Sequence, residues 1–259
     1  MPNGPLSLPA RLYLLSWDTT RLKVTGETHL HHLVRAGALT ELAQRGLLAD
    51  VDGIATPVDV DARTGDLALD GLLELVEESR PRKWKTWVTL RARVTLDAVR
   101  AQLTAEGYLR AGKKRMLGLF PSVDHGLERV AAVDALREEA QAVLRGPLPV
   151  AEVSDRDAAL VALAAAAELR TLAPGKDRKL YKERIEELTE RSGAAAPALK
   201  KVIQEVRTAM IVAATAASTA GAAAGGRPGR WCRPLMPWHG HAARRAARVR
   251  IAGARGFRG

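Results

Sequence analysis

Aliphatic residues recur at helical spacing along most of the chain, and this pattern restricts the fold more than any other feature. Between residues 28 and 45, seven Leu, Val and Ala side chains repeat with a helical period, and Gly46 marks a helix end. Only 4% of the residues are aromatic, so the core must come from aliphatic helices. We therefore expect a mainly α fold, with four further helices over residues 131–144, 155–172, 178–191 and 198–220.

Two regions depart from the helical period. Runs at 47–50, 54–60 and 67–69 are short, of β type, and separated by Asp-Gly and Thr-Gly turns, which predicts a small β-meander. Residues 108–120 predict a protruding β-hairpin with a basic tip at Gly112–Arg115, an apolar returning strand at 116–120 and a strand end at Pro121. Helices are expected around these regions at 8–18, 84–90 and 95–106, and from a cap at Asp70 to Glu78.

The charge of the chain is concentrated at one end. Nine of its 40 basic residues are arginines after Gly226, where no acid or lysine occurs, and removing them leaves 31 basic against 29 acidic residues. Residues 221–259 also lack any period, so we expect a disordered Arg-rich tail after a single globular domain at 6–220. The uncharged run 208–226 is mostly Ala, Thr, Ser and Gly, which insert poorly into lipid, so we expect no transmembrane span.

Several segments together resemble the Golgi phosphoprotein 3 family in order and spacing. They are LVRAGALTELAQRG at 33–46, TGDLALD at 64–70 and AEGYL at 105–109 with the hairpin that follows. The helix around Ala158–Ala164 is similar to the family's central hydrophobic helix. The resemblance is to a bacterial, actinobacterial-type member. It implies a mostly helical domain that binds phosphatidylinositol 4-phosphate through a basic surface pocket, with a hairpin that serves self-association and membrane contact.

The resemblance also assigns the arginines of that pocket. The family's arginine on the first long helix falls on Arg35, and the first of two arginines one turn apart falls on Arg93. Arg91 or Arg100 can take the place of the second. Guanidinium groups bind phosphate bidentately, so we expect Arg35, Arg93 and Arg91 to form the lipid-headgroup site. The sequence departs from the family's tryptophan and second arginine at Gly26 and Leu96.

The hairpin is the second expected contact with a membrane. Basic residues near an anionic surface add about 1 kcal/mol each, and an inserted apolar segment adds more. We therefore expect a cytoplasmic adaptor, peripherally associated with the inner face of the membrane, whose partners are an anionic phosphoinositide-like headgroup, the membrane surface and further copies of itself through the hairpin. A solvated turn with a core-facing strand is the alternative. The hairpin residues concerned are Lys113, Lys114, Arg115, Met116, Leu117, Leu119 and Phe120.

Two other interpretations compete with lipid binding. Arg35 would be a surface charge paired with an acid if the resemblance were ignored. Gly112–Arg115 also mimics the wing of a winged-helix nucleic-acid-binding protein, but the near-neutral body argues against this, so we expect no specific nucleic-acid partner.

The sequence contains no enzyme signature. No Gly-rich phosphate loop follows a strand, and no Ser or Cys has a catalytic partner nearby in the sequence, so we expect neither catalysis nor a cofactor. His29, His31 and His32 form a cluster, but no acid accompanies them at i+4 spacing, so we expect no metal site. Cys232 is the single cysteine, which excludes an internal disulfide.

Overall fold

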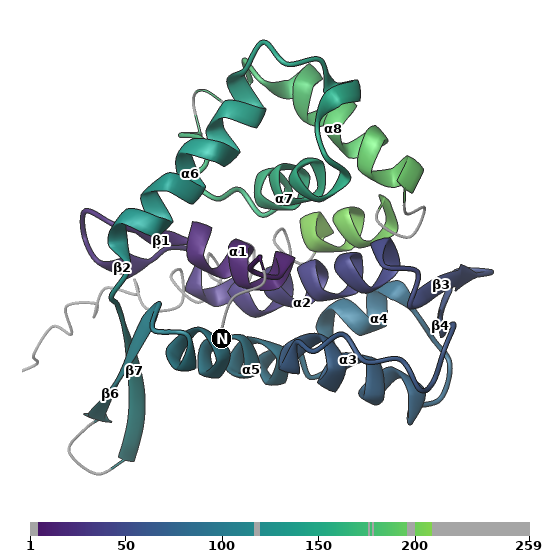
Figure 1. The fold of residues 1–259 in the computed structure, drawn as a ribbon, viewed down its shortest axis with the longest axis horizontal. Coiled ribbons are helices and arrows are strands. Elements are labelled where there is room, and N and C mark those ends of the chain that lie inside the picture. The colour runs from purple at the N-terminus through teal and green to yellow at the C-terminus, as the bar shows by residue number, and fades with distance from the viewer. Residues whose placement is uncertain (1–4, 117–119, 176, 178, 196–199, 209–259) are drawn as a thin grey trace, which may run out of the picture.

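Helix α2 (Glu27–Gln44) lies at the centre of the molecule (Figure 1). The structure, a computed structural model, describes residues 5–116, 120–175, 177, 179–195 and 200–208. In this part of the chain α2 packs against α1 (Leu8–Leu15) on one side and α5 (Ala92–Ala105) on another. The prediction of a mainly helical fold is confirmed, and the helix expected at 28–45 is found.

Gly37 explains how closely α1 crosses α2. A Cβ atom at this position would lie 2.5 Å from Cδ1 of Leu12 and 3.2 Å from Cα of Pro9. Glycine therefore allows a backbone approach that any side chain would obstruct.

The other helices lie in two groups on either side of α2 (Figure 1). One group holds α3 (Leu67–Glu77), α4 (Trp84–Thr89) and α5, and the other holds α6 (Val130–Arg145), α7 (Asp155–Ala166) and α8 (Lys182–Ala195). Nine consecutive residues of α7, Ala158–Ala166, are buried, because this helix packs against α2, α6 and α8. A 3₁₀ turn at Val150–Glu152 precedes α7, and residues 200–208 are helical.

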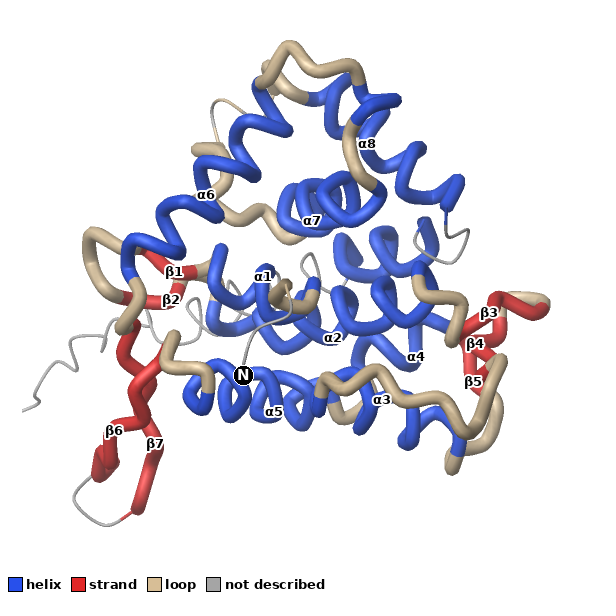
Figure 2. The backbone as a smooth tube through the Cα atoms, in the orientation of Figure 1, coloured by secondary structure: helices blue, strands red, loops and turns tan. Residues whose placement is uncertain are grey.

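The strands form small antiparallel sheets at the edges of the helical body (Figure 2). A first pair, β1 (Trp17–Asp18) and β2 (Lys23–Val24), was not expected from the sequence. A three-stranded sheet has the order β3 (Leu48–Val51), β4 (Ile54–Pro57) and β5 (Arg82–Lys83). The hairpin consists of β6 (Leu109–Met116) and β7 (Phe120–Leu127).

The prediction for the third meander strand was wrong, because residues 67–69 begin helix α3. Asp66, not Asp70, is the N-cap, and its Oδ1 accepts hydrogen bonds from the amides of Ala68 at 2.9 Å and Leu69 at 3.0 Å. Asp70 lies in the first turn and reaches back to accept a hydrogen bond from the Thr64 amide at 2.6 Å. The two carboxylates together fix the helix start and so override the strand-like run of residues.

The hairpin is longer than predicted and its tip lies elsewhere. The supposed tip at Gly112–Arg115 is inside β6, and Pro121, expected to end a strand, pairs with Arg115 in the backbone register. Met116 and Phe120 are the last pair of the ladder. Residues 117–119, expected in the returning strand, lie outside the described residues.

Helix limits differ by a few residues from those expected. α5 begins at Ala92, three residues early, and α7 ends at Ala166, six residues early, where Glu168 takes a positive φ of 55°. The tail at 221–259 and the end of the last expected helix lie outside the described residues. Among the described helices, none has the length and apolar content needed to cross a bilayer.

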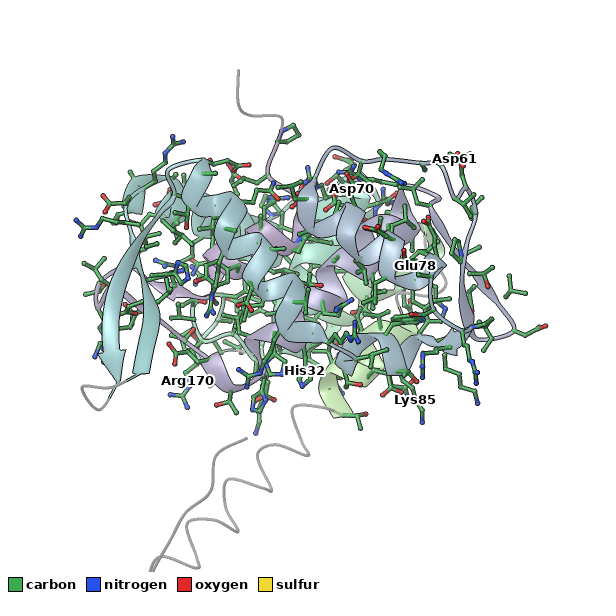
Figure 3. The ribbon with its side chains drawn as sticks, turned by 90° about the horizontal axis from the view of Figure 1, so that it is seen from below. His32, Asp61, Asp70, Glu78, Lys85 and Arg170 are labelled. Atoms are coloured by element: carbon green, nitrogen blue, oxygen red, sulfur yellow. The ribbon has the colours of Figure 1, made fainter. Side chains whose placement is uncertain are left out.

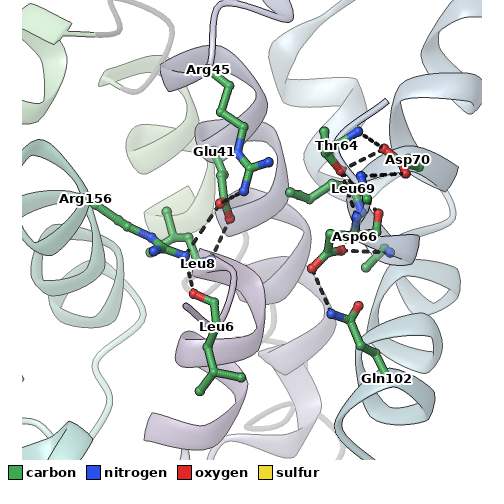
Figure 4. A network of polar contacts seen from close by, with 12 residues as sticks. Leu6, Leu8, Glu41, Arg45, Thr64, Asp66, Leu69, Asp70, Gln102 and Arg156 are labelled. Carbon is green, nitrogen blue, oxygen red and sulfur yellow. Dashed lines mark hydrogen bonds and ion pairs between the residues drawn. The ribbon is translucent and has the colours of Figure 1, made fainter. Parts of the chain in front are cut away.

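A buried carboxylate on α2 contacts the starts of α1 and α7 (Figure 4). Glu41 is 3% exposed, and its Oε2 accepts a hydrogen bond from the Leu8 amide at 2.6 Å. Its Oε1 accepts one from Arg45 at 2.5 Å and lies 3.6 Å from Nη2 of Arg156. Arg156 in turn donates to the Leu6 carbonyl. One acid thus joins the starts of α1 and α7 to α2.

Candidate functional site

Arg35 is a fully buried cation on α2. Its Nη2 donates a hydrogen bond of 2.7 Å to the Arg91 carbonyl, whereas Nε and Nη1 have no hydrogen-bond partner within the described residues. Arg35 also forms no ion pair with any acid in that part of the chain. Because burial removes its hydration, the pKa of the guanidinium is lowered to about 10. Arg35 is therefore an uncompensated buried charge.

Arg91 lies where α4 meets α5, in a strained backbone conformation. Its φ of 51° is left-handed, which costs a non-glycine residue about 1–2 kcal/mol. Its carbonyl accepts hydrogen bonds from Arg35 and from the Val94 amide at 3.0 Å. The buried guanidinium thus holds the first turn of α5.

The start of α5 presents positive charge to solvent. The side chains of Arg91 and Arg93 are exposed, and neither forms an ion pair with a described residue. The helix has no side-chain N-cap and no acid in its first turn. Its first amide groups and the positive end of its dipole therefore favour a bound anion.

Two histidines adjoin these arginines. The ring centroids of His31 and His32 are 3.9 Å apart at an angle of 44°, and Nδ1 of His32 lies 3.2 Å from the Val88 carbonyl of α4. Burial, followed by the charges of His32, Arg93 and His29, lowers the pKa of the His31 imidazole to about 4. Burial is also the main cause that lowers the pKa of His32. We call His31, His32, Arg35, Arg91 and Arg93 the cationic cluster.

His32 of the cationic cluster lies along the same edge of the molecule as Lys85 and Arg170, whereas Asp61 and Asp70 lie along the opposite edge (Figure 3).

The structure brings the three predicted site arginines together but not in a surface hollow. Arg35 donates a hydrogen bond to the Arg91 carbonyl, and the charge of Arg93 contributes to the lowered pKa values of His31 and His32. The expectation that Arg35 lines an open pocket was wrong, because α2 is packed between α4 and α5 and its side chain is 0% exposed. The alternative of a surface charge paired with an acid is contradicted by the same burial.

Sequence reasoning considered the histidines only as metal ligands and missed their place beside the arginines. His32 and His31 precede Arg35 by three and four residues, which places all three on one helical face. That spacing was the available signal. In the described residues, no group of three or more His, Cys, Asp and Glu is arranged to hold a metal ion.

The hairpin lies at the other end of α5 from the cationic cluster. Arg93 is in the first turn of α5 and the hairpin follows the end of this helix, so 12 helical residues, about 18 Å along the axis, separate them (Figure 1). Leu117 and Leu119 lie outside the described residues, and so do the side chains of Lys113, Lys114, Arg115, Met116 and Phe120. Val123 of β7 is exposed.

A hollow of about 580 Å³ opens near the start of α2. Gly26, where the family's tryptophan falls, lines it together with Arg21, Arg137 and Arg170. Arg35 and Arg93 do not line this hollow.

Comparison with known proteins adds a family assignment. The model of the Golgi phosphoprotein 3 family matches residues 8–206, which is more than half of the chain. No curated protein matches the sequence.

Proposed function

The chain belongs to the Golgi phosphoprotein 3 family, and on this premise we propose that it is a peripheral membrane protein whose cationic cluster binds the phosphate of an anionic lipid headgroup. Phosphatidylinositol 4-phosphate is the headgroup that the family resemblance implies. In this proposal the protein acts as a membrane adaptor, on the cytoplasmic face, without catalysing a reaction or using a cofactor.

The observation that carries the proposal is the buried, unpaired guanidinium of Arg35. An isolated buried cation is costly, and proteins usually compensate one with an acid or a bound anion. No acid among the described residues serves Arg35, and the neighbouring ionisable groups, His31, His32 and Arg93, are all bases. A phosphate bound at the start of α5 would supply the missing negative charge.

The groups around α5 fit a phosphomonoester. Such a phosphate carries about 1.5–2 negative charges near neutral pH. The exposed guanidinium of Arg93 can contact it bidentately, Arg91 is exposed at the same end of α5, and the helix start has no side-chain cap that would compete for its amides. Arg35 acts by its charge and by holding the Arg91 carbonyl, since its side chain is enclosed.

Self-association through the hairpin is the second part of the proposal. A two-stranded ribbon leaves backbone groups unpaired along both outer edges, and such edges pair readily with another chain. Light scattering of Val123→Lys would show fewer oligomers than wild type if this surface mediates contact. An unchanged molar mass would contradict it.

No observation favours the nucleic-acid alternative. It depended on a basic wing tip at Gly112–Arg115, and these residues are instead inside strand β6.

Vesicle flotation tests the proposed function. The full chain is mixed with phosphatidylcholine vesicles that contain or lack phosphatidylinositol 4-phosphate, and Arg93→Ser is compared with Arg63→Ser. Both arginines are exposed and both changes remove one charge, but Arg63 is two residues from Asp61, which lies on the edge of the molecule opposite His32. We expect only Arg93→Ser to lose lipid-dependent flotation. Equal flotation of the two variants would refute the cationic cluster as the site.

A further inference from the structure

His31 and His32 lie on the same face of α2 as Arg35, yet they are only half-buried. Their rings are adjacent, with centroids 3.9 Å apart. No interaction that the structure describes pairs either ring with an acid. Two neighbouring imidazoles in such surroundings need an anion before both can hold a second proton.

The orientation of His32 decides which of its nitrogens titrates. Nδ1 faces the Val88 carbonyl at 3.2 Å, and a carbonyl only accepts, so Nδ1 carries the hydrogen of the neutral ring. Nε2 is then an acceptor, which repels a phosphoryl oxygen. When Nε2 takes up a proton it becomes a donor and attracts that oxygen.

The charged groups that face the two rings all disfavour protonation in the empty site. His29 acts from α2 itself and Arg93 from α5, while α4 contributes the Val88 carbonyl, which favours the charged form of His32. A phosphate dianion at the start of α5 opposes the effect of these bases, because its negative charge attracts the imidazolium forms.

We propose that His31 and His32 are ligands of the phosphate in the cationic cluster and that phosphate binding takes up a proton there, so that affinity rises as the pH falls. This inference rests on the proposed function and extends it by naming two further ligands and their regulation. It also gives the site a preference for phosphomonoesters over phosphodiesters, because a doubly charged ligand stabilises the imidazolium more than a singly charged one.

The direction of the pH effect follows from the two states. In the empty site the imidazole of His31 has a pKa of about 4, and a bound phosphate raises it. Affinity therefore increases as the pH falls through the raised pKa toward 4. Uptake of one full proton strengthens binding about tenfold per pH unit.

The experiment compares vesicle binding at pH 8, 7 and 6 for wild type, His31→Gln/His32→Gln and the control Arg63→Ser, a change of an exposed side chain outside both the cationic cluster and the hairpin. Vesicles contain phosphatidylcholine with phosphatidylinositol 4-phosphate. Because each protein meets the same lipid at each pH, the ratio of affinities between wild type and double variant cancels the titration of the lipid. We expect this ratio to increase at least threefold between pH 8 and pH 6, short of the limit of about tenfold per unit.

A second measurement does not depend on the variants. Proton NMR of wild type follows the imidazole titrations with and without soluble inositol 1,4-bisphosphate, and we expect both pKa values to rise when it is bound. A rise without any vesicle binding would keep the histidine ligands but assign the site to soluble phosphate esters instead of a membrane.

The outcomes separate this inference from the proposed function. Wild type and double variant with parallel pH profiles, both still dependent on Arg93, would overturn the histidine inference and leave the lipid site intact. Absence of vesicle binding and of any imidazole response to the soluble ester would overturn both.

Discussion

Replacing Arg35 by methionine separates stability from binding. In most proteins, removing a fully buried arginine leaves a buried acid unpaired and costs several kcal/mol. Arg35 has no acid to leave behind among the described residues, and two of its three nitrogens lack a partner. We therefore expect Arg35→Met to preserve or increase stability while it weakens phosphate binding.

The magnitude follows from the burial of the guanidinium. The lowering of its pKa to about 10 corresponds to a penalty of about 3 kcal/mol on the charged form. The hydrogen bond to the Arg91 carbonyl returns about 1.5–3 kcal/mol, and that carbonyl keeps the Val94 amide as a partner after the change. Methionine fills irregular space well. The variant should thus be between equally stable and about 2 kcal/mol more stable than wild type.

Urea denaturation at pH 7 without phosphate measures this difference, and Arg11→Met is the matched control. Arg11 is also largely buried, but its Nη1 contacts Asp157 at 2.8 Å, so its loss should cost about 1–3 kcal/mol. The penalty on Arg35 is fully present below a pH of about 10 and decreases gradually above it, until the pH reaches the higher pKa of the unfolded chain. A loss of 3 kcal/mol or more in Arg35→Met would refute the reasoning, because it would mean that a partner compensates the charge.

Three other changes test the fold that supports the site. Glu41→Gln should lower the free energy of unfolding by about 2 kcal/mol in urea denaturation, because it removes the charge that Arg45 and Arg156 neutralise; an effect under 0.5 kcal/mol would contradict this. Asp66→Ala should cost about 1 kcal/mol by removing the α3 cap, and Asp66→Asn should cost less, as thermal unfolding would show; equal melting temperatures for the two variants would refute the capping role. Gly37→Ala should destabilise by about 1–3 kcal/mol despite alanine's higher helix propensity, since the new Cβ meets α1, and a stabilised variant in urea would argue against that close crossing.

Much of the helical framework was predictable because the spacing of apolar residues and the residues at the helix ends indicate the same helices. The aliphatic period and the Gly46 stop gave α2 to within a residue at each end. Residues 67–69 misled because a three-residue apolar run fits a strand and a helix equally well. Asp66 decides between them, and its role depends on amides that only the folded turn presents to it.

The hairpin and the cationic cluster show the limits of local patterns. Gly112 was a plausible turn residue, yet it lies inside β6, because the pairing of β6 with β7 continues to Met116 and Phe120. The family resemblance brought Arg35, Arg91 and Arg93 to one region, as the structure has them. Burial of Arg35 was not predictable, since it depends on how α4 and α5 close over α2.

The most direct test of the account is an amide NMR titration of the full chain with inositol 1,4-bisphosphate. If the cationic cluster binds the phosphate, the amides that shift most will belong to residues 29–36 of α2 and 88–94 at the start of α5. Saturable shifts confined to the hairpin or to α6–α8, with these two segments unchanged, would contradict the central claim.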